Sequence, residues 1–227
     1  YTQSGAVVMV DRAVSTDFSG INLSELDGTD GFRLDGATKE DRSGQSVSSA
    51  GDVNGDGFDD VIVGAPHADP NGNFSGSSYV VFGKASGFDA AQNLSSLDGH
   101  NGFRLDGLTG DDRLGKSVSN AGDVNGDGID DLIIGAPFSS PNGLFSGSSY
   151  VVFGKTSGFD ATLDLVSLDG HNGFRLDGEA AQDISGSSVS NAGDVNGDGF
   201  DDLVVSARRI SPNTDNPNLI YVVFGRA

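Results

Sequence analysis

The nine-residue sequence DVNGDGFDD, or DVNGDGIDD, constrains the fold most because it occurs three times at a constant interval. The copies start at Asp52, Asp123 and Asp194, so successive copies are 71 residues apart. Oxygen-bearing side chains stand at loop positions one, three, five and nine, and Gly57 permits a sharp bend. Alternate residues of a tight loop can point at one centre, where a hard cation takes six to eight oxygen ligands. The motif therefore predicts a calcium loop in three copies.

The residues after each loop distinguish the motif from an EF-hand, which has a Glu at position twelve and continues as a helix. Position twelve here is Val63, Ile134 or Val205. The runs VIVGAP, LIIGAP and LVVSAR are short, apolar and mostly β-branched, which predicts a buried strand. An Asx-rich turn without metal is the alternative, since Asn, Asp and Gly are common in ordinary turns. Retention of every oxygen ligand in three copies favours the metal loop.

The rest of the chain repeats with the same period. GFRLDG begins at residues 31, 102 and 173, and YVVFG begins at residues 79, 150 and 221. Each unit predicts four strands, at 45–51, 61–64, 78–83 and 102–106 in the first unit. The first strand has only small or polar side chains and Val, which suits a crowded place where several sheets converge. Four antiparallel strands repeated radially predict an all-β fold, a β-propeller.

The repeat phase predicts an incomplete array. Residues 1–36 form a partial unit of third and fourth strands, in which 6–10 aligns with YVVFG. Residues 37–107 and 108–178 form the first and second repeats, and 179–227 form a third that lacks its fourth strand. Closed propellers have about four to eight blades, so three blades leave open edges. We expect an open or partial propeller, completed by another chain or by missing repeats, with residues 31–35 available to complete the last blade.

The loop followed by Gly64-Ala65-Pro66 or Gly135-Ala136-Pro137 resembles the FG-GAP repeat. That repeat builds the N-terminal propeller of integrin α subunits and occurs in many bacterial secreted proteins. The resemblance covers nearly the whole chain. It implies three calcium sites with these ligands: Asp52, Asn54, Asp56, Phe58 (carbonyl) and Asp60; Asp123, Asn125, Asp127, Ile129 (carbonyl) and Asp131; and Asp194, Asn196, Asp198, Phe200 (carbonyl) and Asp202.

The sequence departs from the family pattern in two respects. Before the first strand only Gly of the Phe-Gly pair is kept, at Ser43-Gly44, Leu114-Gly115 and Ser185-Gly186. In the third copy, Ser206-Ala207-Arg208 replaces Gly-Ala-Pro. This change alters the end of a strand and leaves the predicted metal ligands whole.

Composition excludes several function classes. The formal net charge is −20, and such a field repels phosphate, so nucleic acid and anionic membrane surfaces are poor partners. No apolar run reaches the ~18 residues of a membrane-spanning helix. Cysteine is absent, so stability must come from elsewhere, and calcium can supply it by binding only the folded state. The chain begins at Tyr1, and we expect a processed or trimmed piece of a longer protein.

Other recurring residues are interpreted structurally. His100 and His171 each precede Asn-Gly and indicate a turn, and His67 occupies a variable position. Arg33, Arg104 and Arg175 are expected to pair with a nearby carboxylate or with carbonyls between blades. The position-eight carboxylates are expected to accept hydrogen bonds from backbone N–H groups; they are Asp59, Asp130 and Asp201. No nucleophile-base or metalloprotease motif is present, so we predict no catalytic residues and no enzyme.

These observations predict a secreted, extracellular calcium-binding propeller segment with a structural or adhesive role. The expected partners are further copies of the chain, through open blade edges or terminal strands, as a ring or a filament, and extracellular protein or matrix. One alternative is a carbohydrate-binding propeller that uses the loops at Phe74 and Phe145 or residues 212–217, although the chain lacks Trp. Another is an accessory domain of a larger secreted enzyme.

Overall fold

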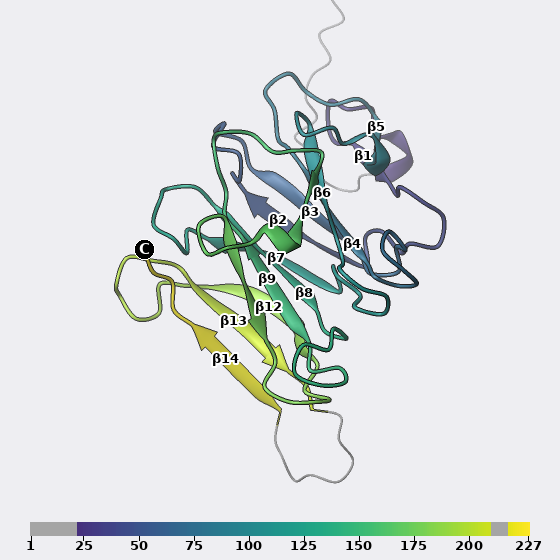
Figure 1. Ribbon diagram of the computed structural model, residues 1–227. Helices are drawn as coiled ribbons and strands as arrows, with labels where there is room; N and C mark the ends of the chain where they lie inside the picture. Colours follow the sequence, from purple (N-terminus) through teal and green to yellow (C-terminus); the bar gives the residue numbers. More distant parts are fainter. Residues whose placement is uncertain (1–21, 210–217) are drawn as a thin grey trace, which may run out of the picture.

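A computed structural model describes residues 22–209 and 218–227 of the chain, and their regular secondary structure is almost all β-strand, joined by turns and loops (Figure 1). The predicted strand at 6–10 and the candidate glycan-binding segment at 212–217 lie outside the described residues. Three one-turn 3₁₀ helices interrupt the strands: η1 (Leu23–Glu25), η2 (Leu94–Ser96) and η3 (Leu165–Ser167). The all-β fold class is therefore confirmed.

The strands recur in three groups, as the repeat predicts. A short strand precedes them, β1 (Arg33–Asp35). The first group is β2 (Ser46–Gly51), β3 (Asp60–Ala65), β4 (Ser77–Val81), β5 (Ala91–Asn93) and β6 (Gly102–Asp106). The second is β7 (Ser117–Gly122), β8 (Asp131–Ala136), β9 (Ser148–Val152), β10 (Thr162–Leu163) and β11 (Gly173–Asp177). The third is β12 (Ser185–Gly193), β13 (Asp202–Ala207) and β14 (Leu219–Val223).

The longer strands of each group, without β5 and β10, form an antiparallel sheet, which we call a blade. Blade 1 has the order β6-β4-β3-β2, blade 2 has β11-β9-β8-β7, and blade 3 has β14-β13-β12. Figure 1 shows the three sheets side by side, and β7 contacts both β2 and β12. The first strands, rich in small residues, are therefore the innermost ones where the sheets converge. Three such blades without ring closure are a partial propeller.

Neighbouring blades approach closely at the glycines of the Gly-Ala-Pro motif. A Cβ atom at Gly64 would lie 2.0 Å from the carbonyl oxygen of Gly115 in blade 2, and one at Gly135 would lie 2.1 Å from that of Gly186 in blade 3. No side chain fits at such distances, so these positions require glycine. Ser206 stands at the matching position of blade 3, and β13 has the same six-residue length as β3 and β8. The Ser-Ala-Arg variation thus leaves the strand intact.

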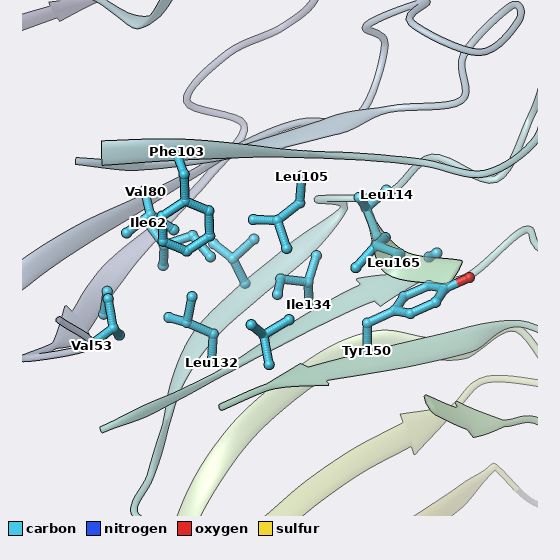
Figure 2. Packing of buried hydrophobic residues seen from close by; sticks show 14 of the residues in the cluster. Val53, Ile62, Val80, Phe103, Leu105, Leu114, Leu132, Ile134, Tyr150 and Leu165 are labelled. Carbon is cyan, nitrogen blue, oxygen red and sulfur yellow. The ribbon is translucent and has the colours of Figure 1, made fainter. Parts of the chain in front are cut away.

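The hydrophobic core lies between the blades. Phe103 and Leu105 point from blade 1 toward Leu132 and Ile134 of blade 2, and all four side chains are buried (Figure 2). Because side chains alternate along a strand, Ile133 faces the other way and packs in the cluster that includes Leu203 of blade 3. Burial of each such side chain contributes roughly 1.5–3 kcal/mol. Blade 2 is therefore apolar on both faces, as the β8 sequence predicted.

Two short parallel pairings connect successive units. The strand β5, in the connection between β4 and β6, pairs with β1, and β10, in the connection between β9 and β11, pairs with β6. The sequence did not predict these pairings. They also correct one expectation: residues 31–35 do not complete blade 3, because β1 lies beside β5 and blade 3 has three strands among the described residues.

Candidate metal loops

The three Asp-rich motifs occupy equivalent places in the fold. Each joins the first strand of a blade to the second, from β2 to β3, β7 to β8 and β12 to β13. A loop between two strands is what the apolar run after the motif predicted. The predicted ligand residues of each copy are therefore brought together within one hairpin.

In the first loop, the side-chain carboxylate and amide oxygens accept hydrogen bonds from backbone N–H groups of the same loop. Asp52 accepts from Asp56 N at 2.9 Å and from Gly57 N at 2.8 Å. The Asn54 side-chain oxygen also accepts from Asp56 N, and Asp56 accepts from Phe58 N, both at 2.9 Å. Gly57 has φ +90°, a conformation that side chains disfavour, so the motif glycine is needed for the bend.

The second and third loops repeat this arrangement. Asp123 accepts from Asp127 N at 3.0 Å and from Gly128 N at 2.8 Å. Asp194 accepts from Asp198 N at 3.1 Å and from Gly199 N at 2.9 Å. The hydrogen bond from Gly199 N is the main cause that holds the pKa of Asp194 below its usual value. Three copies of one sequence thus form one local structure in three blades.

The position-nine carboxylate is buried and ties the loop to the third strand of its blade. Asp60 is 1% exposed and accepts from Val53 N at 3.1 Å and Gly83 N at 2.8 Å. Asp131 makes the same contacts with Val124 N and Gly154 N, and Asp202 with Val195 N and Gly225 N. Burial raises the pKa of both Asp60 and Asp131 to about 7, although these N–H groups oppose the shift. Such a carboxylate is stabilised in its charged form by a nearby cation.

The position-eight carboxylate links neighbouring blades. Asp130 of blade 2 accepts from Asp52 N of blade 1 at 2.9 Å, and Asp201 of blade 3 accepts from Asp123 N of blade 2 at 3.0 Å. The expectation that these residues accept backbone N–H bonds is confirmed for Asp130 and Asp201. The sequence did not reveal that the donor belongs to the preceding loop.

The donor chemistry of the loops fits a hard divalent cation. All predicted ligand atoms are oxygens, the preference of calcium. Within the described ranges, the buried carboxylates of Asp60, Asp131 and Asp202 form no ion pair with Lys or Arg. In the same ranges, no group of three or more His, Cys, Asp or Glu side chains is arranged to hold a metal ion. The loop carboxylates face the loop's own N–H groups instead, so the ligand assignment stays a prediction.

The other residues singled out by the sequence have structural contacts. His100 N and His171 N donate to Asp98 and Asp169 at 3.0 and 2.9 Å, which confirms their place in Asx turns. Each recurring Arg pairs with the Asp two residues later, in Arg33–Asp35, Arg104–Asp106 and Arg175–Asp177.

The loop aromatic residues also pack against neighbours. Phe74 lies 4.6 Å from the His67 ring and Phe145 lies 5.4 Å from Phe138, measured between ring centroids. Each ring of the candidate glycan-binding loops thus packs against a neighbouring ring.

The sequence reasoning missed Phe88 and Phe159, which lie in the connections that carry β5 and β10. Each ring stacks on a Phe of the preceding unit, with centroids 4.1 Å apart for Phe88–Phe32 and 4.2 Å for Phe159–Phe103. A signal was present, since Gly-Phe-Asp-Ala occurs at both 87–90 and 158–161, again 71 residues apart.

Comparison with known proteins gives consistent matches. The FG-GAP repeat matches residues 43–81, 114–152 and 185–223, which together make up more than half of the chain. Integrin alpha pat-2 of Caenorhabditis elegans is 32% identical over 72% of this chain and 13% of its own length. Integrin alpha ina-1 of the same organism is 28% identical over 91% of this chain and 18% of its own. Phosphatidylinositol-glycan-specific phospholipase D of Bos taurus is 30% identical over 73% of this chain and 18% of its own.

The chain thus spans less than a fifth of the length of these relatives. No helix within the described ranges has the length and apolar character needed to cross a bilayer.

Proposed function

Because this chain belongs to the FG-GAP repeat family, we propose that it is an extracellular, calcium-stabilised propeller segment with an adhesive role and no catalytic activity. The observation that carries the proposal is the recurrence of one oxygen-rich loop at the same hairpin of three blades. Within each loop the ligands are the side chains at positions one, three, five and nine and the carbonyl at position seven. Calcium bound there supplies positive charge to a loop whose only charged side chains are carboxylates.

The stabilising effect of calcium follows from the position of the loops. Each loop joins the first two strands of its blade. Its buried position-nine carboxylate also accepts a hydrogen bond from the backbone N–H of the glycine that follows the third strand. A ligand that binds only the folded state stabilises by about 2.7 kcal/mol per site at a hundredfold excess over its dissociation constant. Calcium in extracellular fluid therefore favours the folded blades, and three sites act on one array.

The repeat boundaries form part of the proposal. Residues 37–107 and 108–178 make complete units, 179–227 a unit without its fourth strand, and 1–36 a partial unit. Two of the relatives described above are named as integrin alpha chains, which motivates extracellular protein or matrix as the partner.

The similarity to a phospholipase D motivates a second candidate function, an accessory propeller of a larger secreted enzyme. The two candidates differ in their partner. Direct binding of the purified chain to immobilised extracellular-matrix proteins, reduced by chelator, is the result expected for adhesion. Binding to no matrix protein would favour the accessory role.

Calcium binding is tested by titration calorimetry and by thermal unfolding of the purified chain with calcium or with excess EGTA. We expect three sites and a melting temperature at least about 5 °C lower in EGTA, restored by added calcium. The variant D56N/D127N/D198N keeps side-chain shape and removes one charge per loop, and we expect it to lose most of this response. The control D30N/D89N/D160N removes the same charge from exposed positions outside the loops and should keep it. Identical melting curves with calcium and with EGTA would refute the proposal.

A further inference from the structure

Successive metal loops are hydrogen-bonded to one another, although they lie 71 residues apart in the sequence. The position-eight carboxylate stands between the predicted ligands at positions seven and nine of its own loop. In the second loop this residue is Asp130, which accepts at 2.9 Å from the backbone N–H of Asp52, the first predicted ligand of the first loop. In the third loop it is Asp201, which accepts from Asp123 N of the second loop at 3.0 Å. The second and third loops therefore each hold the first predicted ligand of the preceding loop.

A second route joins the buried position-nine carboxylates through the backbone. Asp131 of the second loop accepts from Gly154 N at 2.9 Å. The next amide, Lys155 N, donates to Val53 O of the first loop at 2.9 Å. Val53 N in turn donates at 3.1 Å to Asp60, the position-nine carboxylate of the first loop. A continuous hydrogen-bonded path therefore connects a predicted ligand of the second loop with one of the first.

The same path continues from the third loop to the second. Asp202 accepts from Gly225 N at 3.0 Å, and the next amide, Arg226 N, donates to Val124 O at 2.9 Å. Val124 N then donates to Asp131 at 3.0 Å. Asp131 belongs to both paths, and among the described residues no hydrogen bond joins the first loop directly to the third. The three loops are therefore connected in series through the second.

Side chains of one blade also pack on the loop of the preceding blade. A Cβ atom at Gly126, position four of the second loop, would lie 2.3 Å from the Phe200 ring of the third loop. A Cβ atom at the matching Gly55 of the first loop would lie 2.6 Å from Thr156 Cγ2 of the second unit. Because the carbonyl of Phe200 is itself a predicted ligand, a movement of this one residue affects both the second and the third loop.

We propose that the three calcium sites fill cooperatively, with the second loop coupled to the first and to the third, and with Asp130 and Asp201 as the positioning residues. This inference rests on the calcium binding proposed above. When the second loop closes around its cation, positions seven to nine take one arrangement, and Asp130 is held where it accepts from Asp52 N. The first loop is then already ordered at its first ligand, so it binds the next cation more tightly. Such a contiguous network is a physical basis for coupling between sites.

Repulsion between the bound ions would have the opposite effect. Two divalent cations in neighbouring loops repel each other, so electrostatics alone makes the second ion bind more weakly. Coupling through the hydrogen-bonded network makes it bind more tightly. The sign of the interaction between neighbouring loops therefore separates the two effects.

The test is a calcium titration of the whole, isotopically labelled chain followed by NMR. The amides of Gly57, Gly128 and Gly199 each donate to the first Asp of their own loop, so each reports the occupancy of one loop. D127N keeps side-chain shape but weakens binding in the second loop. It should raise the calcium concentration needed to half-saturate the first and third loops at least about fivefold. Unchanged or lowered concentrations would overturn the proposal.

A comparison within the series tests whether the coupling follows contacts. D56N weakens the first loop, so it should reduce calcium affinity in the second loop more than in the third. Equal effects on both would contradict coupling in series. If none of the three glycine amides of the wild-type chain responds to calcium, the calcium proposal itself fails and this inference fails with it. Three responding but independent sites overturn this inference alone.

Variants at position eight identify the coupling residue. D130A should reduce the effect of D127N on the first loop and leave its effect on the third loop unchanged, because Asp201 is intact. D130N keeps an oxygen acceptor for the Asp52 amide and should retain the coupling. D59A is the matched control, since it removes an exposed carboxylate from the same motif position, and it should change neither effect. A D130A chain that keeps wild-type circular dichroism and the full effect of D127N on the first loop would overturn the role of Asp130.

Discussion

The strands β6 and β11 have the same five residues and differ in what covers them. In β6 the side chains of Phe103 and Leu105 are 0% exposed, whereas their counterparts Phe174 and Leu176 in β11 are half-buried. The local sequence and the antiparallel partner are equivalent, since β4 and β9 both read SSYVV. Burial at this position is therefore decided by the neighbouring unit, as expected for a repeat protein whose core lies between repeats.

The largest expected effect tests this difference directly. F103A should destabilise the chain by about 3–5 kcal/mol, because it removes a fully buried ring that stacks on Phe159. F174A should cost about 1 kcal/mol, since half-exposed side chains lose less burial. Chemical denaturation of both variants in the same calcium-containing buffer gives the two free energies of unfolding. Equal losses would mean that residues 158–163, which carry Phe159 and β10, do not determine burial at β6.

The second prediction concerns Phe159, the ring that covers Phe103. F159A should cost about 2 kcal/mol, because Phe159 is only partly buried but loses its stack on Phe103 and the Lys155 contact. It should also make β6 resemble β11. Hydrogen exchange by NMR should show the Arg104 amide, bonded to Ala161 O, exchanging as fast as the Arg175 amide. Unchanged protection of Arg104 in F159A would contradict this, and F145A, in an outer loop, is the control for loss of one ring.

Sequence predicted the strands whose pattern is local. The apolar run 61–64 corresponds to β3 (Asp60–Ala65), and the predicted strand 102–106 equals β6. These strands have β-branched or aromatic residues between glycine-containing turns, so neighbouring residues carry the signal. The strands β5 and β10 have three and two residues, and their partners belong to another unit. The residues Ala-Gln-Asn of β5 and Thr-Leu of β10 show no strand pattern of their own. They are extended because their backbones bond to the edge strands β1 and β6.

For the candidate metal loops too, the local features could be predicted from the sequence and the long-range contacts could not. Their positions between strands, and the capacity of the position-eight carboxylates to accept N–H bonds, follow from motif spacing. Which N–H is bonded does not, since Asp130 reaches a donor 78 residues earlier in the chain. The predicted calcium ligands follow from the type of side chain at each loop position, because all of them offer oxygen atoms.

The smallest predicted effect applies the comparison to the loops. Asp130 and Asp59 share motif position eight, but Asp130 bonds Asp52 N of the preceding blade, while Asp59 is exposed and has no hydrogen-bonding partner among the described residues. D130A should therefore cost about 1 kcal/mol, because it leaves a partly buried N–H without its charged acceptor. D59A removes the same charge and should change stability by less than about 0.5 kcal/mol. Both are measured by urea denaturation in EGTA, where metal binding does not contribute. A loss from D59A as large as that from D130A would show that position eight acts within its own loop and not between blades.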